Sequence, residues 1–267
     1  MPASRDTTME RAWDLFEAGD VELALEAADS VRLEDPDDPE ATLLCAAGLQ
    51  ELGDLEQALP LARRAVELAP DEHFARMTLA SLLYETCMFQ EGLEVVDGAL
   101  ADRYDDPFAH HIRGLLLDAL GRYRESDAAF ARASEIDPDS FPPPLSMDRK
   151  SFDRAVQQAA AALPDEFRSR LGDLPVLVED VPPPDLLKTL DDPAPDLLGL
   201  FVGVPLTLKT THDVPSMPDA IYLFKRNLER ACADEDELVE QIGVTLRHEL
   251  GHYLGMDEDD LEEAGHA

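Results

Sequence analysis

Basic side chains are scarce in this sequence, and the deficit limits its possible partners. Its 22 lysines and arginines stand against 58 aspartates and glutamates, which gives a formal net charge of −36 at pH 7. Both halves contribute, because residues 1–149 hold 33 acidic and 12 basic side chains and residues 150–267 hold 25 and 10. Such a field repels phosphate backbones, so we expect no nucleic acid among the partners.

Cysteines and long apolar runs are scarce as well. Cys45, Cys87 and Cys232 are far apart, odd in number and form no CxxC pair, which argues against a disulfide framework or a cysteine zinc site. The most apolar segment, Leu197–Leu208, is too short to cross a bilayer, and the first residues contain no apolar run of the signal-peptide kind. We therefore expect a protein of the reducing cytoplasm that does not bind a membrane.

Apolar residues make up 45% of the 267 positions, enough for the packed cores of two domains.

A period of 34 residues runs through the first 140 positions. Its turn column holds Gly19, Gly53, Cys87 and Gly121. Two columns of small residues repeat at the same period, namely Ala12, Ala46, Ala80 and Gly114, and Ala24, Ala58, Gly92 and Ser126. Pro36, Pro70 and Pro138 close three of the units, and Tyr104 holds that place in the third.

This pattern predicts a pair of antiparallel helices per unit. Small side chains let two helices approach, glycine permits the turn between them, and proline ends each unit because it cannot continue a helix. The sequence resembles four tetratricopeptide repeats over residues 5–138, which implies a curved solenoid whose concave face binds a protein partner or a peptide segment. A scaffold or dimerisation role is the alternative. Because the third copy has Cys87 and Tyr104 at its turns, we expect those turns to differ.

A proline-rich linker, residues 139–148, is predicted to separate the repeats from a second domain over residues 149–267. In that domain "RKSFDRAVQQAAAALP" predicts a helix that ends at Pro164, and "LPVLVEDVPPP" predicts a short strand. "LLGLFVGVPLTL" predicts a strand pair or a bent strand, and "PDAIYLFKRNL" another strand. "DEDELVEQIGVTLRHELGHYLG" predicts a final helix that begins with acidic residues and ends at Gly255.

The final helix contains an HExxH motif. His248 and His252 are four residues apart, so their imidazoles project from one helix face and can bind one metal ion. Glu249 is placed to reach a water on that ion and to act as a general base. The two histidines fill only part of a tetrahedral shell, so a third ligand must come from elsewhere.

The third ligand is expected among the acidic residues that follow Gly255. Glu258 lies ten residues beyond His248, where a chain turned back by Gly255 meets the metal. Its neighbours Asp257 and Asp259 are alternatives, since carboxylate oxygen is a normal zinc ligand. His266 lies one residue from the end of the sequence and ranks below them.

From about Phe152 onward the order of these segments resembles the small bacterial minimal zincin-like metallopeptidase family. The family motif is HExxHxxGxxD, so the resemblance implies one zinc ion per chain, held by His248, His252 and the residue at 258. It implies Glu249 as the base, and Glu258 stands where the family has aspartate. It also implies that the strand over Ala220–Phe224 borders the cleft and offers its edge to an extended substrate.

The predicted fold class is therefore α+β overall, with an all-α tetratricopeptide-type solenoid followed by a small α+β minimal zincin domain. The leading hypothesis is a zinc-dependent metallopeptidase whose repeats recruit a peptide or protein substrate, or a protein partner. The alternative is an adaptor protein whose zincin domain is a structural or regulatory metal-binding module with little peptidase activity. A third possibility is a site that has lost its metal, because Glu258 departs from the family motif.

Overall fold

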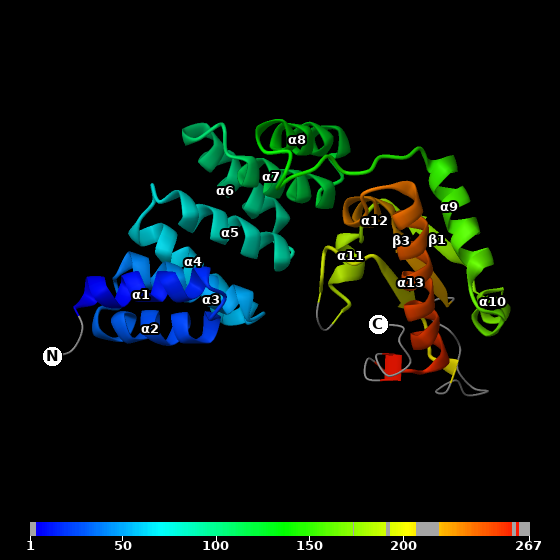
Figure 1. The fold of residues 1–267 in the computed structure, drawn as a ribbon, viewed down its shortest axis with the longest axis horizontal. Coiled ribbons are helices and arrows are strands. Elements are labelled where there is room, and N and C mark those ends of the chain that lie inside the picture. The colour runs from blue at the N-terminus through cyan, green and yellow to red at the C-terminus, as the bar shows by residue number, and fades with distance from the viewer. Residues whose placement is uncertain (1–3, 173, 191–192, 207–218, 258–259, 262–267) are drawn as a thin grey trace. The chain divides into compact units, whose positions relative to one another are not determined.

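A computed structural model describes residues 4–172, 174–190, 193–206, 219–257 and 260–261. The chain divides into two compact units, one of residues 1–142 with 187–195 and the other of residues 143–186 with 196–267. Helices build the first unit, whereas the second combines helices with a three-stranded sheet, so the predicted α+β class is confirmed (Figure 1). Within the described ranges, no helix is long and apolar enough to cross a bilayer.

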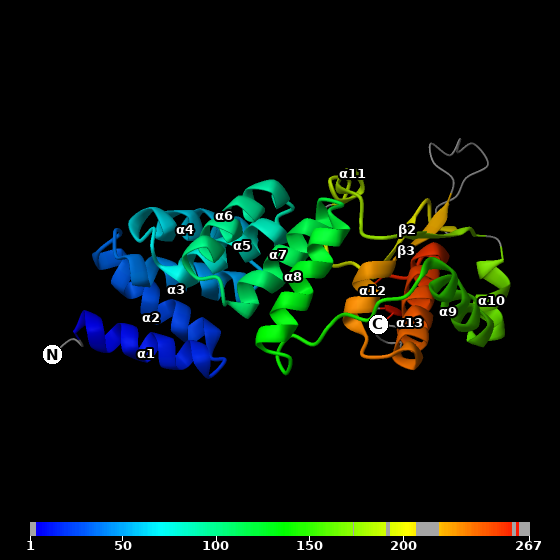
Figure 2. The same cartoon turned by 90° about the horizontal axis from the view of Figure 1, so that it is seen from above.

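The helices of the first unit are arranged in four consecutive pairs (Figures 1 and 2). The pairs are α1 (Arg5–Glu17) with α2 (Val21–Glu34), α3 (Pro39–Glu51) with α4 (Leu55–Leu68), α5 (His73–Glu85) with α6 (Phe89–Asp102), and α7 (Pro107–Ala119) with α8 (Tyr123–Ile136). The first helices α1, α3, α5 and α7 also contact one another in series. They therefore lie on the inner, shorter side of the curve, and we call this side the concave face.

The turn within each pair has the same backbone conformation in all four copies. The residues of the turn column have positive φ: Gly19 +84°, Gly53 +77°, Cys87 +58° and Gly121 +72°. In the third copy Cys87 N donates to Tyr84 O at 3.0 Å and Met88 N donates to Leu83 O at 2.7 Å, the Schellman pattern that ends the other first helices too. The expectation that this turn differs was wrong, because helix packing imposes the left-handed conformation on a non-glycine residue.

The turn between copies is also uniform. The residues that end α2, α4, α6 and α8 have closely similar φ: Asp35 −133°, Ala69 −134°, Arg103 −136° and Asp137 −140°. The next residue is proline in three copies and Tyr104 in the third. Proline suits the extended backbone at this position but is not required for it. The expectation that the turn at Tyr104 differs was therefore also wrong.

Cys87 should be the strained member of the turn column, which yields a first prediction. We expect Cys87→Gly to raise the free energy of unfolding by about 0.5–1 kcal/mol, since relief of the left-handed strain exceeds the entropy cost of glycine. Chemical denaturation of the two proteins measures the difference. The matched control is Gly53→Ala, which should lower the stability by about 1 kcal/mol. A loss of stability in both variants would contradict the argument.

The columns of small residues are buried where helices meet. Ala12, Ala46 and Ala80 are fully buried, and Gly114 takes their place in the fourth copy. A methyl group on Gly114 would lie 2.7 Å from the ring of Phe130 in α8, so only glycine lets that ring pack there. The period in the sequence therefore predicted the close helix contacts correctly.

The second unit places a three-stranded sheet beside its helices (Figure 1). From residue 149 onward the elements are α9 (Arg149–Ala162), α10 (Asp165–Leu171), β1 (Val176–Glu179), α11 (Pro184–Leu187), β2 (Gly199–Val202), β3 (Ala220–Phe224), α12 (Lys225–Ala231) and α13 (Glu235–Leu254). The predicted first and last helices are confirmed as α9 and α13. Of the predicted strand over residues 218–228, the structure shows a strand over Ala220–Phe224. From Lys225 the chain is helical, because Leu228 packs into the core and Lys225 Nζ pairs with Glu229 one turn later, 2.8 Å away.

The strand order is β1-β3-β2, with β3 parallel to β1 and antiparallel to β2. On one side of β3, Ile221 N donates to Pro175 O at 3.0 Å, and on the other Phe224 N donates to Leu198 O at 2.9 Å. The hypothesis that Ala220–Phe224 offers its edge to a substrate was therefore wrong, because β3 is the central strand. Strand β2 lies at the edge of the described sheet.

One core joins the sheet to α9 and α13. Phe152 of α9 and Ile221 and Leu223 of β3 are fully buried in it, together with α13 residues at helical spacing, Leu238, Ile242, Leu246 and Leu250. These α13 side chains recur every four residues, so one helix face is anchored in the core. His248 and His252 each lie two residues from a core position, so they project from another face of the same helix.

Candidate metal centre

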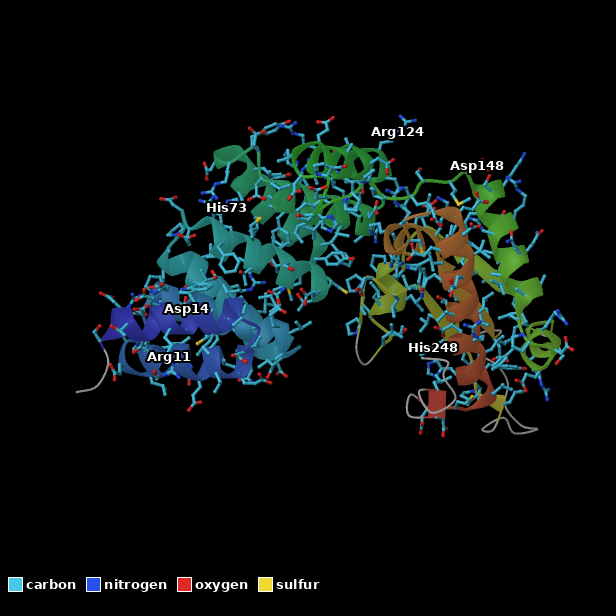
Figure 3. The ribbon with its side chains drawn as sticks, viewed as in Figure 1. Arg11, Asp14, His73, Arg124, Asp148 and His248 are labelled. Atoms are coloured by element: carbon cyan, nitrogen blue, oxygen red, sulfur yellow. The ribbon has the colours of Figure 1, made fainter. Side chains whose placement is uncertain are left out.

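The helix α13 begins and ends at defined positions, which fixes where its histidines lie. Asp234 caps its first turn by accepting from Glu237 N at 2.9 Å, and three acidic residues in that turn suit the positive end of the helix dipole. Gly255 ends it with φ +90°, as the sequence predicted. His248 lies in the C-terminal half of this helix (Figure 3).

The imidazoles of His248 and His252 point their Nε2 atoms at each other. The two nitrogens are 3.0 Å apart, and the ring planes are nearly perpendicular at 85°. A tetrahedral zinc ion bound at about 2.0–2.1 Å to each nitrogen needs a separation of about 3.3 Å. The pair is therefore close to the geometry of two ligands on one ion.

The other ring nitrogen of His252 has a partner that favours metal binding. Nδ1 lies 3.3 Å from the carbonyl oxygen of Met256, just beyond the helix end. A proton on Nδ1 donates to that oxygen, which leaves the lone pair of Nε2 directed at the proposed ion. Sequence reasoning missed this contact, because a backbone carbonyl carries no signal in the residue type.

Glu249 is buried between α13 and the edge strand. The residue is only 6% exposed, and its Oε2 accepts the backbone N–H of Phe201 in β2 at 2.6 Å. Gly199 makes this approach possible, because a Cβ there would lie 2.5 Å from Thr245 Cγ2 and 3.5 Å from Glu249 Cγ. Phe201 and Gly199 are thus site residues that the sequence did not single out, although a glycine inside an apolar strand signals close backbone approach.

The edge of β2 that faces away from β3 lies at Glu249. Leu198 pairs with Phe224 through a hydrogen bond, so the alternation of an antiparallel ladder directs the N–H and C=O groups of Gly199 and Phe201 outward. The Phe201 ring packs on Tyr253 of α13, with ring centroids 5.5 Å apart. An extended peptide that pairs with this edge would therefore pass beside Glu249.

The described residues beyond Gly255 contact one another and α13. Asp257 Oδ1 accepts from Asp260 N at 3.0 Å and Asp260 Oδ2 accepts from Asp257 N at 3.3 Å, which is a reciprocal cap of the next turn. The fully buried Leu261 packs directly on Gly251 of α13. The carboxylate of Asp257 is thus engaged by a backbone N–H, which makes it a weaker candidate for the third ligand.

Three residues of the predicted site lie outside the described residues. They are Glu258, the expected third ligand, and the lower-ranked Asp259 and His266. Over the ranges that the structure describes, no three His, Cys, Asp or Glu side chains gather into a group that could hold a metal ion. Of the predicted centre, the structure therefore describes His248, His252 and Glu249.

The cysteines do not take part in this centre. All three are free thiols, and burial raises the pKa of Cys45 and of Cys232 to about 11. Both thiols are therefore protonated near neutral pH and are poor metal ligands.

Comparisons with known proteins match the two parts of the chain separately. Residues 171–266 match the family described as zincin-like metallopeptidase, and residues 49–116 and 109–140 match tetratricopeptide repeat families. Among curated proteins none matches the chain.

Among solved structures, MamA residues 41 to the end from Desulfovibrio magneticus RS-1 is 21% identical and has a TM-score of 0.45. The match covers 50% of this chain and 75% of that one. A structure titled MamA MSR-1 is 19% identical with a TM-score of 0.43, and the match covers 52% of this chain and 82% of that one. The chain thus carries tetratricopeptide repeats over residues 49–140 and a zincin-like metallopeptidase domain over residues 171–266.

Proposed function

We propose that the second unit is a zinc-dependent peptidase and that the repeats recruit its protein substrate or a protein partner. The observation that carries this proposal is the convergence of His248 Nε2 and His252 Nε2, 3.0 Å apart, beside a buried Glu249. His248, His252 and Glu258 would hold one zinc ion per chain. A zinc ion bound there supplies a Lewis acid for the peptide carbonyl and lowers the pKa of its water to about 7.

Glu249 acts as the general base in this proposal. One carboxylate oxygen, Oε2, accepts the Phe201 N–H at 2.6 Å, which orients the group that takes the proton of the attacking water. The proton then passes to the nitrogen of the leaving amine as the peptide bond breaks. The bond to Phe201 also ties the base to the strand on which we place the substrate.

The substrate binds as an extended strand on the outer edge of β2. The C=O of Phe201, in the half-buried part of β2, points away from β3 and can make a main-chain hydrogen bond, which recognises a backbone and not a side chain. This mode suits a peptidase of broad sequence preference. The repeats then supply selectivity by binding a different part of the substrate.

Metal removal tests the proposal on the full chain. We expect zinc-loaded protein to cleave members of a peptide library, a chelator to abolish cleavage, and added zinc to restore it. Mass spectrometry of the products and metal analysis of the protein are the measurements. Cleavage that persists without metal would contradict the mechanism, and one zinc per chain with no peptide cleaved would favour the adaptor alternative.

A further inference from the structure

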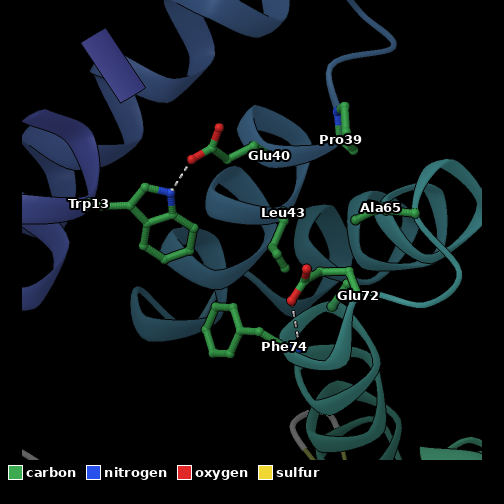
Figure 4. Close-up of a pocket in the computed structure, with 9 residues that line it drawn as sticks. Trp13, Pro39, Glu40, Leu43, Ala65, Glu72 and Phe74 are labelled. Carbon is green, nitrogen blue, oxygen red and sulfur yellow. Dashed lines mark hydrogen bonds between the residues drawn. The ribbon is translucent and has the colours of Figure 1, made fainter. Parts of the chain in front are cut away.

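Two adjoining cavities open on the concave face of the repeats. The first has a volume of about 370 Å³ and is lined by residues of α1, α3, α4 and α5, among them Trp13, Glu40, Leu43, Glu72 and Phe74 (Figure 4). The second has a volume of about 500 Å³ and is lined among others by Phe16, Gln50, Glu51, Met77, Glu85 and Phe108. Phe74 lines both, so the two cavities are neighbours, and we call them together the groove.

Aromatic rings give this groove its apolar wall. Trp13 and Phe74 meet edge to face with ring centroids 5.7 Å apart, although they belong to the first and third repeats. Phe74 and Phe108 are each 40% exposed, and they occupy the same position of successive repeats. Large exposed rings gathered in one place are typical of a surface where another chain binds.

The polar part of the groove is acidic. Four glutamates line the two cavities, and the described residues that line them include no lysine or arginine. The negative charge of Glu40 is balanced by Arg5, 2.7 Å away, and its carboxylate also accepts the indole N–H of Trp13 at 2.9 Å. Glu72 instead caps the start of α5 through Phe74 N, and Glu51 is exposed at the end of α3.

We propose that this groove binds a basic polypeptide segment in which lysine or arginine alternates with apolar side chains. A cationic side chain lies against the rings of Trp13 and Phe74 with its charge near Glu72, and apolar side chains fill the second cavity. The surplus of 21 acidic side chains over residues 1–149 attracts such a segment at long range. This inference rests on the proposed recruiting role of the repeats and names the chemistry of what they recruit.

Trp13 makes the proposal directly measurable, because it is the one tryptophan of the chain. The test uses full-length Glu249→Gln protein, so that no probe is cut, and a synthetic peptide that alternates lysine with leucine. We expect a saturable change in tryptophan emission, and binding at least about tenfold weaker when salt rises from about 0.05 to 0.5 M. A peptide with every lysine replaced by glutamate should give no change. Equal binding of both peptides, or binding that leaves Trp13 emission unchanged, would overturn the proposal.

Matched variants locate the site. Phe74→Ala and Glu72→Gln should each lower the affinity for the basic peptide by about three- to tenfold. This is the range of a partly exposed cation–π or ionic contact. The controls on the second helix α2 are Leu33→Ala, at a side chain that is 72% exposed, and Glu34→Gln, and both should bind as the parent does. Circular dichroism verifies that each variant is folded. If the groove variants and the α2 controls changed the peptide affinity equally, the groove would not be the binding site. If the wild type showed no peptidase turnover, the proposed function would fail but these binding results would be unchanged.

Discussion

Replacing Glu249 with glutamine is expected to lower kcat/KM for peptide hydrolysis by about 10³-fold, with zinc content unchanged. General acid–base catalysis contributes about 10²–10⁴-fold, and an amide cannot accept the proton of the attacking water. The replacement keeps the shape of the side chain, and its carbonyl oxygen can still accept the Phe201 N–H that Oε2 accepts now. The strand β2 therefore stays in place, so the loss reports chemistry and not folding.

The control for this variant is Glu240→Gln on the same helix. Glu240 is exposed, and its replacement removes the same charge from α13 without touching β2. We expect its kcat/KM and its zinc content to equal those of the wild type. If Glu249→Gln and Glu240→Gln cleaved the peptide at the same rate, Glu249 would not be the base, and a contaminating peptidase would be the first explanation to exclude.

The repeat unit was predictable from sequence because its signals are local and recur. A turn residue every 34 positions and small residues at two helix contacts define both the helices and the way they pack. The third copy shows the limit of that argument. Cys87 breaks the glycine column but keeps its positive φ of 58°, because the neighbouring helices determine the turn and the residue only tolerates it.

In the second unit the sequence predicted the two long helices and the positions of the strands, but not the short helices α10, α11 and α12 or the order of the strands. Strands of four or five residues carry too little pattern to reveal their order, so nothing in the sequence distinguished the central β3 from the edge strand β2. The start of α12 was also missed, because no glycine or proline separates Phe224 from Lys225. Sheet order depends on long-range pairing, which a single sequence does not display.

Some residues of the candidate site could be predicted from the sequence, and others were found only in the fold. His248, Glu249 and His252 were named from their spacing, since three residues within one helical turn and a half define their own geometry. Phe201 and Met256 act through backbone groups, which any residue type supplies. They were therefore invisible until the fold brought them to Glu249 and His252.

Replacing His252 with alanine is expected to weaken zinc binding by more than about 10²-fold, beyond the cost of losing an outer-shell partner. His252 contributes one of the two converging nitrogens, and its Nδ1 contact to Met256 O is lost with it. Competition with a zinc-binding dye measures the affinity of each protein. His111→Gln, a histidine of α7 in the repeats, is the matched control and should keep the affinity of the wild type.

The same assay identifies the third ligand. We expect Glu258→Ala to weaken zinc binding about as strongly as His252→Ala, because each removes one of three proposed protein ligands. Asp257→Ala should leave zinc affinity unchanged but lower the stability by about 1 kcal/mol, since the Asp257 carboxylate caps the turn that begins there. The reverse outcome, zinc lost with Asp257→Ala and retained with Glu258→Ala, would transfer the ligand role to Asp257. The hydrogen bond from Asp260 N to Asp257 Oδ1 would then have to break for the metal to bind.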